Sequence, residues 1–327
     1  MQPMRWLAML LALSGCAPLS TTTDPPSLPA GPSVVVLGIA QDAGYPHAGC
    51  RRSCCELAWR RPELRRKVSS LAIVDPGSGE RWIVDATPDL TAQLRAVHEL
   101  DTPARVFPPE SPIAEQLGLT GILLTHAHVG HYTGLMLLGR EGVGSRKVPV
   151  WVMPRMRTFL ESHEPWRQLV ALGQIDLRGL EPDRALRLNE RIAVTPLLVP
   201  HRDEHSETVG YVIEGPSRSV AFIPDIDKWE RWDLRIEDLL ARVDLAYLDG
   251  TFFADGEVPG RSMSEIPHPF IEETMARLSE LPETERAKVR FIHLNHTNPA
   301  LVPGSAAERE VERRGFAVAR EGERIGL

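Results

Sequence analysis

Residues 121–138 read GILLTHAHVGHYTGLMLL, an apolar run followed by three closely spaced histidines, His126, His128 and His131. The apolar run predicts a buried strand, and in extended backbone His126 and His128 project from the same face. Gly130 permits a sharp turn, so that His131 can swing back from the start of the next helix. Three imidazoles converging at a strand end suit a cation such as zinc. The alternative is a polar loop with incidental histidines.

The composition is that of a globular domain without a basic excess. The chain has 327 residues, and its 37 Lys and Arg against 44 Asp and Glu give a net charge of −7. A chain that must neutralise a phosphate backbone needs the opposite balance, which argues against general nucleic-acid binding. Hydrophobic residues make up 43% and charged residues 25%, values typical of soluble globular proteins and not of multi-span membrane proteins.

The N-terminus has the pattern of a targeting segment. Arg5 precedes an apolar run that ends at Leu13, far short of the roughly 20 residues that span a bilayer but suited to a secretory signal. Leu13-Ser14-Gly15-Cys16 resembles the bacterial lipobox, which implies cleavage before Cys16 and its lipidation; a plain secretory signal is the alternative. We therefore expect a signal peptide at 1–15, a flexible Pro/Ser/Thr-rich tether at 16–33 and a periplasmic protein whose only membrane attachment is the lipid at Cys16. In known lipoproteins an Asp after the lipidated Cys favours retention in the inner membrane. This chain has Ala17 there, so the resemblance implies an anchor in the outer membrane.

The remaining chain alternates between apolar runs and helix-like stretches. We expect strands at 34–39, 71–75, 81–86, 121–126, 148–153, 191–200, 208–215, 219–225, 243–249 and 289–294. Helix-like patterns cover 89–99, 132–140, 154–163, 228–241 and 268–280. Adjacent strand runs predict hairpins and strand–helix–strand alternation predicts parallel pairing, so residues 34–327 should form one α/β domain of two stacked mixed sheets with helices outside.

Five motifs, in order, resemble the metallo-β-lactamase superfamily. His-Ala-His-Val-Gly-His at 126–131 is similar to its signature His-x-His-x-Asp-His, and the similarity extends over nearly all of 34–327. The resemblance implies a four-layer αββα sandwich. It also implies that Asp85 in WIVDATPD orients the metal loop. The metal ligands that it implies are His126, His128, His131, His201 in LLVPHRDEH, Asp225 in VAFIPDID and His293 in FIHLNHTNP.

Gly130 departs from the signature, in which that position is a carboxylate ligand of the second metal. The first metal position keeps its full set, whereas the second would retain only His131, Asp225 and His293. Asp42, Asp227 or His205 could substitute, and the sequence does not choose among them. We expect one or two zinc ions, with manganese or iron as alternatives.

Two families within the superfamily are closer in pattern. The segments PHRDEHSETVGY, LDGTFF and HLNHTNP resemble pyrroloquinoline quinone biosynthesis B proteins. The Cys and His pattern resembles the cyclic phosphodiesterase of the carbon–phosphorus lyase pathway and, more distantly, the tRNA-processing phosphodiesterases. In those enzymes a His downstream of an Asp/Glu-x-Thr segment assists departure of the leaving group. His268 in IPHPFIEETMARL, after Asp249-Gly250-Thr251, occupies the corresponding place; the alternative is a helix-terminal His flanked by prolines.

A second cluster consists of Cys50, Cys54 and Cys55. An odd number of cysteines leaves one thiol over if a disulfide forms, whereas Cys₃His coordination of zinc uses all three. The resemblance to the carbon–phosphorus-pathway enzyme implies a structural zinc, with His296 as fourth ligand. The spacing of the cysteines differs from that of the family, and His47 is an alternative ligand. A disulfide between two of the cysteines is the other alternative if the compartment is oxidising.

These features predict a metal-dependent hydrolase in which metal-bound hydroxide attacks the substrate and His268 donates a proton. A small anionic phosphodiester is the expected substrate class, and a lactone or another ester is the alternative. An iron-dependent redox enzyme or carrier like the pyrroloquinoline quinone biosynthesis B proteins is one alternative. A non-catalytic binding protein on the same fold is the other. The sequence makes no prediction of oligomeric state.

Overall fold

The computed structural model describes residues 31–327 apart from 101–107, 109, 112–115, 259 and 261. The predicted signal peptide, Cys16 and most of the predicted tether lie outside these residues. Within the described part, no helix combines the length and the apolar character needed to cross a membrane.

The first sheet is built around a β-hairpin and a parallel series. In spatial order its strands are β14 (Arg324–Gly326), β1 (Ser33–Gly38), β2 (Ser70–Asp75), β3 (Glu80–Val84), β4 (Gly121–Leu123), β5 (Val148–Val152) and β6 (Ile175–Gly179). Strands β14 to β3 pair antiparallel, and β3 to β6 pair parallel. The β2–β3 turn forms because Oδ1 of Asp75 accepts the N–H groups of Gly77 and Ser78, and Gly79 adopts a φ of 74°.

The second sheet repeats this division. In spatial order its strands are β13 (Ala317–Val318), β12 (Val289–Ile292), β11 (Leu245–Asp249), β10 (Ser219–Ile223), β9 (Val209–Glu214), β8 (Ala193–Leu198) and β7 (Leu186–Arg187). The strands from β7 to β10 pair antiparallel, and those from β10 to β13 pair parallel. Since parallel neighbours end at the same edge, the loops after β10, β11 and β12 meet there.

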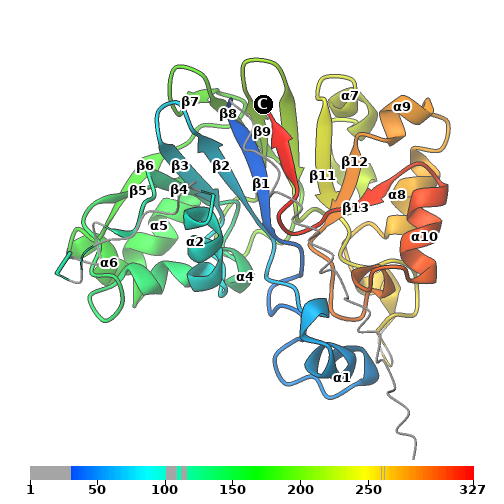
Figure 1. Ribbon diagram of the computed structural model, residues 1–327. Coiled ribbons are helices and arrows are strands. Elements are labelled where there is room, and N and C mark those ends of the chain that lie inside the picture. The colour runs from blue at the N-terminus through cyan, green and yellow to red at the C-terminus, as the bar shows by residue number, and fades with distance from the viewer. Residues whose placement is uncertain (1–30, 101–107, 109, 112–115, 259, 261) are drawn as a thin grey trace, which may run out of the picture.

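Helices cover the outer faces of both sheets, which gives the four layers seen in Figure 1. Beside the first sheet lie α2 (Leu90–His98), α4 (Val129–Tyr132), α5 (Pro154–Ser162) and α6 (Trp166–Ala171). Beside the second lie α7 (Ile236–Leu240), α8 (Ile271–Arg277), α9 (Glu283–Arg286) and α10 (Ala306–Arg313). Helix α1 (Ser53–Arg60) stands apart, below both sheets in that view.

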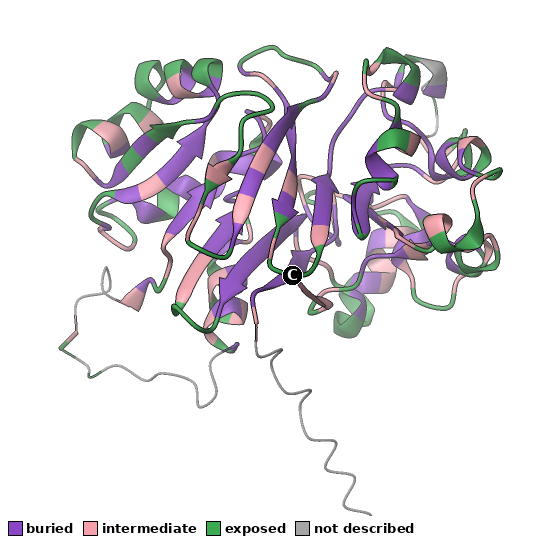
Figure 2. Ribbon diagram, turned by 90° about the horizontal axis from the view of Figure 1, so that it is seen from above, coloured by how far each residue is buried: buried purple, intermediate pink, exposed green. Residues whose placement is uncertain are grey.

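Alternation along β1 shows how the layers are held together. Val34 and Val36 join the core between the sheets, whereas Val35 and Leu37 join the core under the helices of the first sheet. All four side chains are buried, because β1 is covered on both faces. Figure 2 shows the same distribution, with buried strands in the middle and exposed residues on the outer faces of the helices.

The predicted two-sheet αββα architecture is confirmed, and the boundaries differ in detail. Residues 228–241 are not one helix but a 3₁₀ turn, Trp229–Arg231, followed by α7. His126 and His128 lie in the turn after the short strand β4 and not in extended strand. The elements that the apolar pattern missed are α1, α6, α9, α10, β6, β7, β13 and β14.

Candidate metal centre

The side chains singled out in the sequence meet where the strands of both sheets end. The loop after β4 carries His126 and His128, and α4 carries His131. The second sheet contributes His201 after β8 and, from the ends of β10 and β12, Asp225 and His293. Apart from His128, these side chains are buried.

One group consists of His126, His128, His201 and Asp225, whose ligand atoms all lie within 4.8 Å of one another. The Nε2 atoms of His126 and His201 lie 2.9 and 3.2 Å from Nδ1 of His128. The carboxylate of Asp225 faces the same two rings, at 3.4 Å from His126 Nε2 and 3.3 Å from His201 Nε2. The first predicted ligand set is therefore assembled in space.

A second group consists of Asp42, His131 and His293. Oδ1 of Asp42 lies 3.5 Å from Nε2 of His131 and 4.0 Å from Nε2 of His293. The carboxylate of Asp225 lies between the groups, because its Oδ2 is 3.7 and 3.8 Å from the same two nitrogens. Asp225 is thus placed to contact ions on both sides.

Asp42 occupies the space of the carboxylate that Gly130 lacks. A Cβ atom at Gly130 would overlap Oδ1 of Asp42 and lie 2.6 Å from its Cα. The two other substitutes considered from the sequence lie elsewhere. Asp227 contacts Nδ1 of His201 and the guanidinium of Arg231, and the ring of His205 stacks on Phe159.

Four buried polar atoms in this region make no hydrogen bond within the described part of the chain. They are Oδ1 of Asp42, Nε2 of His131, Oδ1 of Asp225 and Nε2 of His293. Buried polar groups without partners are rare, because each loses its hydration without compensation. These atoms are imidazole nitrogens and carboxylate oxygens, the donors that zinc, manganese and iron accept. The donor set therefore fits a metal ion.

Further polar groups hold the rings in place. Asp85, buried and at a φ of 69°, accepts a hydrogen bond from Nδ1 of His131 at 2.7 Å. Its two oxygens also accept the N–H and hydroxyl of Thr125. On the other side, the Thr251 hydroxyl lies 3.0 Å from Nδ1 of His293. Contacts of this kind select the ring nitrogen that faces a metal.

His268 lies beside the group, hydrogen-bonded to the carboxylate of Asp249 and close to that of Asp225. Its Nδ1 is 2.8 Å from Oδ2 of Asp249 and 3.2 Å from Oδ1 of Asp225. Asp249 is fully buried and also accepts the N–H groups of Ile226 and Thr251. With Nδ1 engaged, Nε2 is the ring nitrogen left to exchange a proton with another molecule.

The charges of the site shift several pKa values strongly. Burial lowers the pKa of His268, but Asp249 and Asp225 outweigh burial and raise it to about 9. Burial likewise lowers the pKa of His131, and the charges of Asp85 and Asp42 raise it to about 10. Burial raises the pKa of Asp225, but the surrounding histidines hold it well below its usual range. The carboxylate of Asp225 is therefore ionised.

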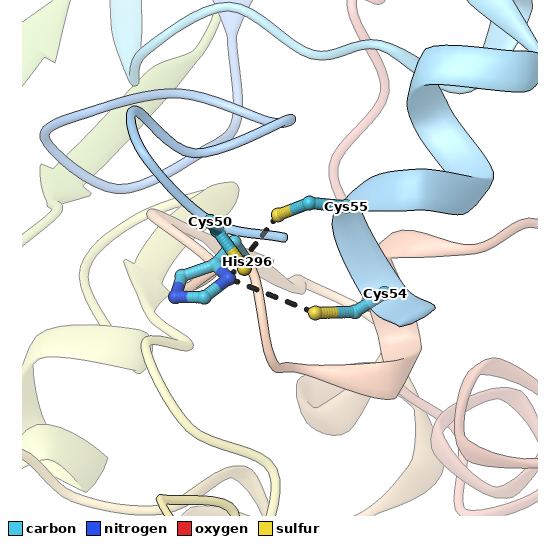
Figure 3. A group of neighbouring side chains, drawn as sticks. All are labelled: Cys50, Cys54, Cys55 and His296. Atoms are coloured by element: carbon cyan, nitrogen blue, oxygen red, sulfur yellow. Dashed lines mark hydrogen bonds between the residues drawn. The ribbon is translucent and has the colours of Figure 1, made fainter. Parts of the chain in front are cut away.

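The second cluster joins α1 to the loop after β12 (Figure 3). Cys50, Cys54, Cys55 and His296 have ligand atoms within 4.8 Å of one another. Nδ1 of His296 lies 3.3 Å from Sγ of Cys55 and 3.8 Å from Sγ of Cys54. The three cysteines are free thiols. The alternative ligand His47 does not point a nitrogen into this group; its ring packs on His296, with centroids 4.4 Å apart.

Residues 80–294 match a β-lactamase superfamily domain; this stretch contains β3 to β12 and all the candidate ligands of the centre except Asp42. The chain belongs to the β-lactamase superfamily. The superfamily predicted from the histidine motif is thus confirmed. Coenzyme PQQ synthesis protein B from Methylobacterium nodulans is 33% identical over 323 residues, covering 90% of this chain and 99% of that protein.

Comparison with solved structures gives related proteins of the same fold. Zinc-bound PqqB from Methylobacterium extorquens superposes with a TM-score of 0.72 at 25% identity, over 90% of this chain and all of that one. A diphosphatase of the PhnP family superposes with a TM-score of 0.59 at 19% identity, over 90% and 97% of the two chains, which shows a shared fold.

The motifs of the superfamily led to most of the side chains at this centre, but not to all of them. Asp249 was noted only as a landmark for His268, although its position at the end of an apolar strand run was a usable signal. The hydroxyls of Thr125 and Thr251 had no signal beyond adjacency to a candidate residue. Glu204, whose Oε2 lies 3.1 Å from Nε2 of His128, was not distinguishable from other surface carboxylates.

Proposed function

We propose that this protein is a metal-dependent hydrolase that acts on a phosphodiester or a related ester. The observation that carries the proposal is the set of buried, unpartnered nitrogen and oxygen atoms that face one another in the centre. The residues that would hold a first ion are His126, His128, His201 and Asp225. Asp42, His131 and His293 would hold a second ion, together with the carboxylate of Asp225. Zinc is the ion we favour, because a zinc-bound PqqB shares the fold.

A metal ion bound here would supply a Lewis acid that lowers the pKa of water to about 7. The residues of the chain supply the rest. Asp85 and Asp227 hold the rings of His131 and His201. The charges of Asp249 and Asp225 raise the pKa of His268 to about 9, so His268 is the residue suited to donate a proton to the departing oxygen. Asp249 orients His268 through Nδ1.

The first experiment measures hydrolysis together with metal content. We expect the purified protein to hydrolyse bis(4-nitrophenyl) phosphate and to contain stoichiometric metal in the centre. Removing one nitrogen ligand, as in His126→Ala, should lower kcat by at least about a hundredfold, because ligand loss weakens or misplaces the ion. His163→Ala is the matched control, since His163 is exposed and outside the centre. Unchanged activity in His126→Ala would discard the proposal.

The second experiment tests the role of His268. His268→Gln keeps a polar side chain, but an amide cannot act as a general acid. The loss of rate should be small for esters with a 4-nitrophenolate leaving group and about a hundredfold for alkyl esters, which need protonation to depart. A merely structural role would lower both rates equally. The ratio of the two rate losses therefore decides whether His268 acts on the leaving group.

A second candidate function rests on the match over nearly the whole chain to coenzyme PQQ synthesis protein B. On this reading the centre serves a PqqB-like reaction with iron. Turnover, measured together with metal content on protein from its native host, separates the two, because the PqqB structure also holds zinc. Iron with oxygen-dependent turnover would support the second candidate, and zinc or manganese with phosphodiester hydrolysis would support the first.

We further propose that Cys50, Cys54, Cys55 and His296 bind a structural zinc. Three sulfurs and one ring nitrogen at mutual distances below 4.8 Å suit tetrahedral zinc with Cys₃His ligands. The backbone N–H of His47 points at Sγ of Cys55 at 3.3 Å, and such donors stabilise a thiolate. A disulfide found in native protein by mass mapping would contradict this site.

A further inference from the structure

A cavity of about 570 Å³ lies beside the cysteine cluster, since Cys50 and His296 line it. Gln41 on its wall directly precedes Asp42, and Asn295 follows His293 by two residues. Phe252, also on the wall, has its ring centroid 6.1 Å from that of His268, in an edge-to-face arrangement. Through Phe252, the cavity therefore adjoins a residue that packs against His268.

Part of the lining of the cavity carries positive charge. Arg51 and Arg52 line it, and none of its described lining residues is a carboxylate. Both arginines are exposed, and neither makes a salt bridge or a side-chain hydrogen bond to another described residue. In a chain with a net charge of −7, two adjacent unpaired arginines over a cavity form a local attraction for anions.

Another part of the lining is apolar. Phe252, Val258 and Ile266 line it, and Phe252 and Ile266 belong to a small hydrophobic cluster of their own with Met263 and Phe270. Pockets of this kind bind ligands through apolar contact and use a few polar groups to orient them. A cavity whose lining is cationic in one part and apolar in another fits a ligand that has an anionic end and an apolar or aromatic body.

We propose that this cavity is the substrate subsite of the metal centre and that Arg51 and Arg52 determine its specificity. The ligand class is a small molecule in which a phosphate, phosphonate or carboxylate group is joined to an apolar or aromatic body. The arginines hold the anionic group, and the Phe252 wall holds the body so that its scissile bond faces His268. This inference rests on the proposed function and specifies the class of substrate for it.

A purely structural role for the arginines is the competing explanation. The charge of Arg52 acts on Cys50 and on His296, so it can stabilise thiolates of the cysteine cluster. Arg51 is not among the main causes of the pKa shift of either residue. The variant Arg51→Ala therefore removes charge from the cavity while leaving the electrostatics of the cysteine cluster in place.

The test is calorimetric titration of the metal-loaded protein with phenylphosphonate, which cannot be hydrolysed. Methylphosphonate and benzyl alcohol report the anionic and aromatic parts separately. We expect Kd for phenylphosphonate to rise about tenfold in R51A/R52A and severalfold in Arg51→Ala, since each partly exposed charge contributes modestly. R51K/R52K should recover part of the affinity, and higher salt should weaken binding. Benzyl alcohol should bind equally to all variants.

The matched control is R60A/R61A, a pair of exposed arginines on and just after α1 that do not line the cavity. An equal loss of affinity in this control would overturn the inference, as would unchanged affinity in R51A/R52A or a loss of affinity that parallels loss of zinc from the cysteine cluster. Repeating the titrations in His126→Ala separates this inference from the proposed function. Arginine-dependent binding that persists without catalysis supports the subsite alone, whereas binding that requires His126 but not the arginines places the anion on the metal.

Discussion

At the scale of single residues, the centre depends on an exchange between positions 42 and 130. Asp42 brings its carboxylate from the loop after β1, and it fits only because Gly130 has no side chain. The backbone of Gly130 does not have a positive φ, so the glycine is required by space and not by conformation. In the superfamily signature the residue at position 130 carries this carboxylate. In this chain Asp42 provides a carboxylate at a similar place.

This exchange predicts the behaviour of three variants. Asp42→Ala should lose one metal ion per chain, because His131 and His293 keep no carboxylate of their own. Gly130→Ala should have a similar effect, since the added Cβ must displace Asp42, at a cost of about 1–3 kcal/mol. D42G/G130D should retain the metal, because it restores the carboxylate at the signature position.

Elemental analysis of the metal-to-protein ratio checks these variants. Asp255→Asn is a suitable control, since that carboxylate is exposed and outside both groups. A full metal complement in Asp42→Ala would show that Asp42 is not a ligand.

The sequence predicted which histidines meet, but it could not choose Asp42. Each ligand His follows an apolar strand, which is visible as a local pattern. The place of Asp42 depends instead on a long-range contact. The N–H of Gln41 donates to the carbonyl of Leu294, and the N–H of Leu294 donates to the carbonyl of Ile39, which fixes this loop beside His293. A contact over about 250 residues leaves no local trace.

At the scale of elements, α1 contacts the domain through a small apolar face and through the cysteine cluster. Its buried residues are Cys55 and Ala58, so its apolar face is small for an eight-residue helix. Isolated helices of this length are unstable in water, because so few hydrogen bonds cannot offset the cost of nucleation. The cluster also holds His296, and through the loop 293–296 it borders the metal centre.

Cysteine substitution therefore has a prediction at this scale. Cys55→Ser should lose one zinc per chain, lower Tm by roughly 5 °C or more, and increase amide exchange in α1. Zinc analysis, calorimetry and hydrogen exchange measure the three effects. His47→Ala is the control, since its ring packs on His296 without joining the ligand group, and it should retain zinc. Retention of zinc in Cys55→Ser, with α1 unchanged, would contradict a structural metal.

Several of the missed elements have few apolar residues, as β6 and α10 show. Strand β6 has buried Ile175 and Leu177 separated by exposed charges, and it lies at the edge of its sheet. Helix α10 buries Ala307, Glu308 and Val311 in an otherwise charged segment. Such segments take their structure from the surface on which they pack, and that surface is assembled from distant parts of the chain.

At the scale of the whole molecule, the direction of β1 separates attachment from catalysis. The predicted tether leads into Ser33, where β1 begins beside the C-terminal strand β14, and Asp42 follows the other end of β1 (Figure 1). A strand of six residues is about 20 Å long. The metal centre therefore lies at the end of the sheets away from the chain's entry, where a membrane anchor would leave it open to solvent.

This separation predicts that the anchor can be removed without loss of the centre. We expect wild-type protein to be labelled by palmitate and to sediment with membranes, because the segment up to Cys16 resembles a lipobox. Cys16→Ser should lose the label and move to the soluble periplasmic fraction, while its metal content and its rate on bis(4-nitrophenyl) phosphate stay as in wild type. Ser14→Thr is a matched control that leaves the cysteine in place. Label that persists in Cys16→Ser would exclude lipidation at that residue. Loss of metal in the released protein would instead mean that the anchor contributes to the folded domain, contrary to the position of β1.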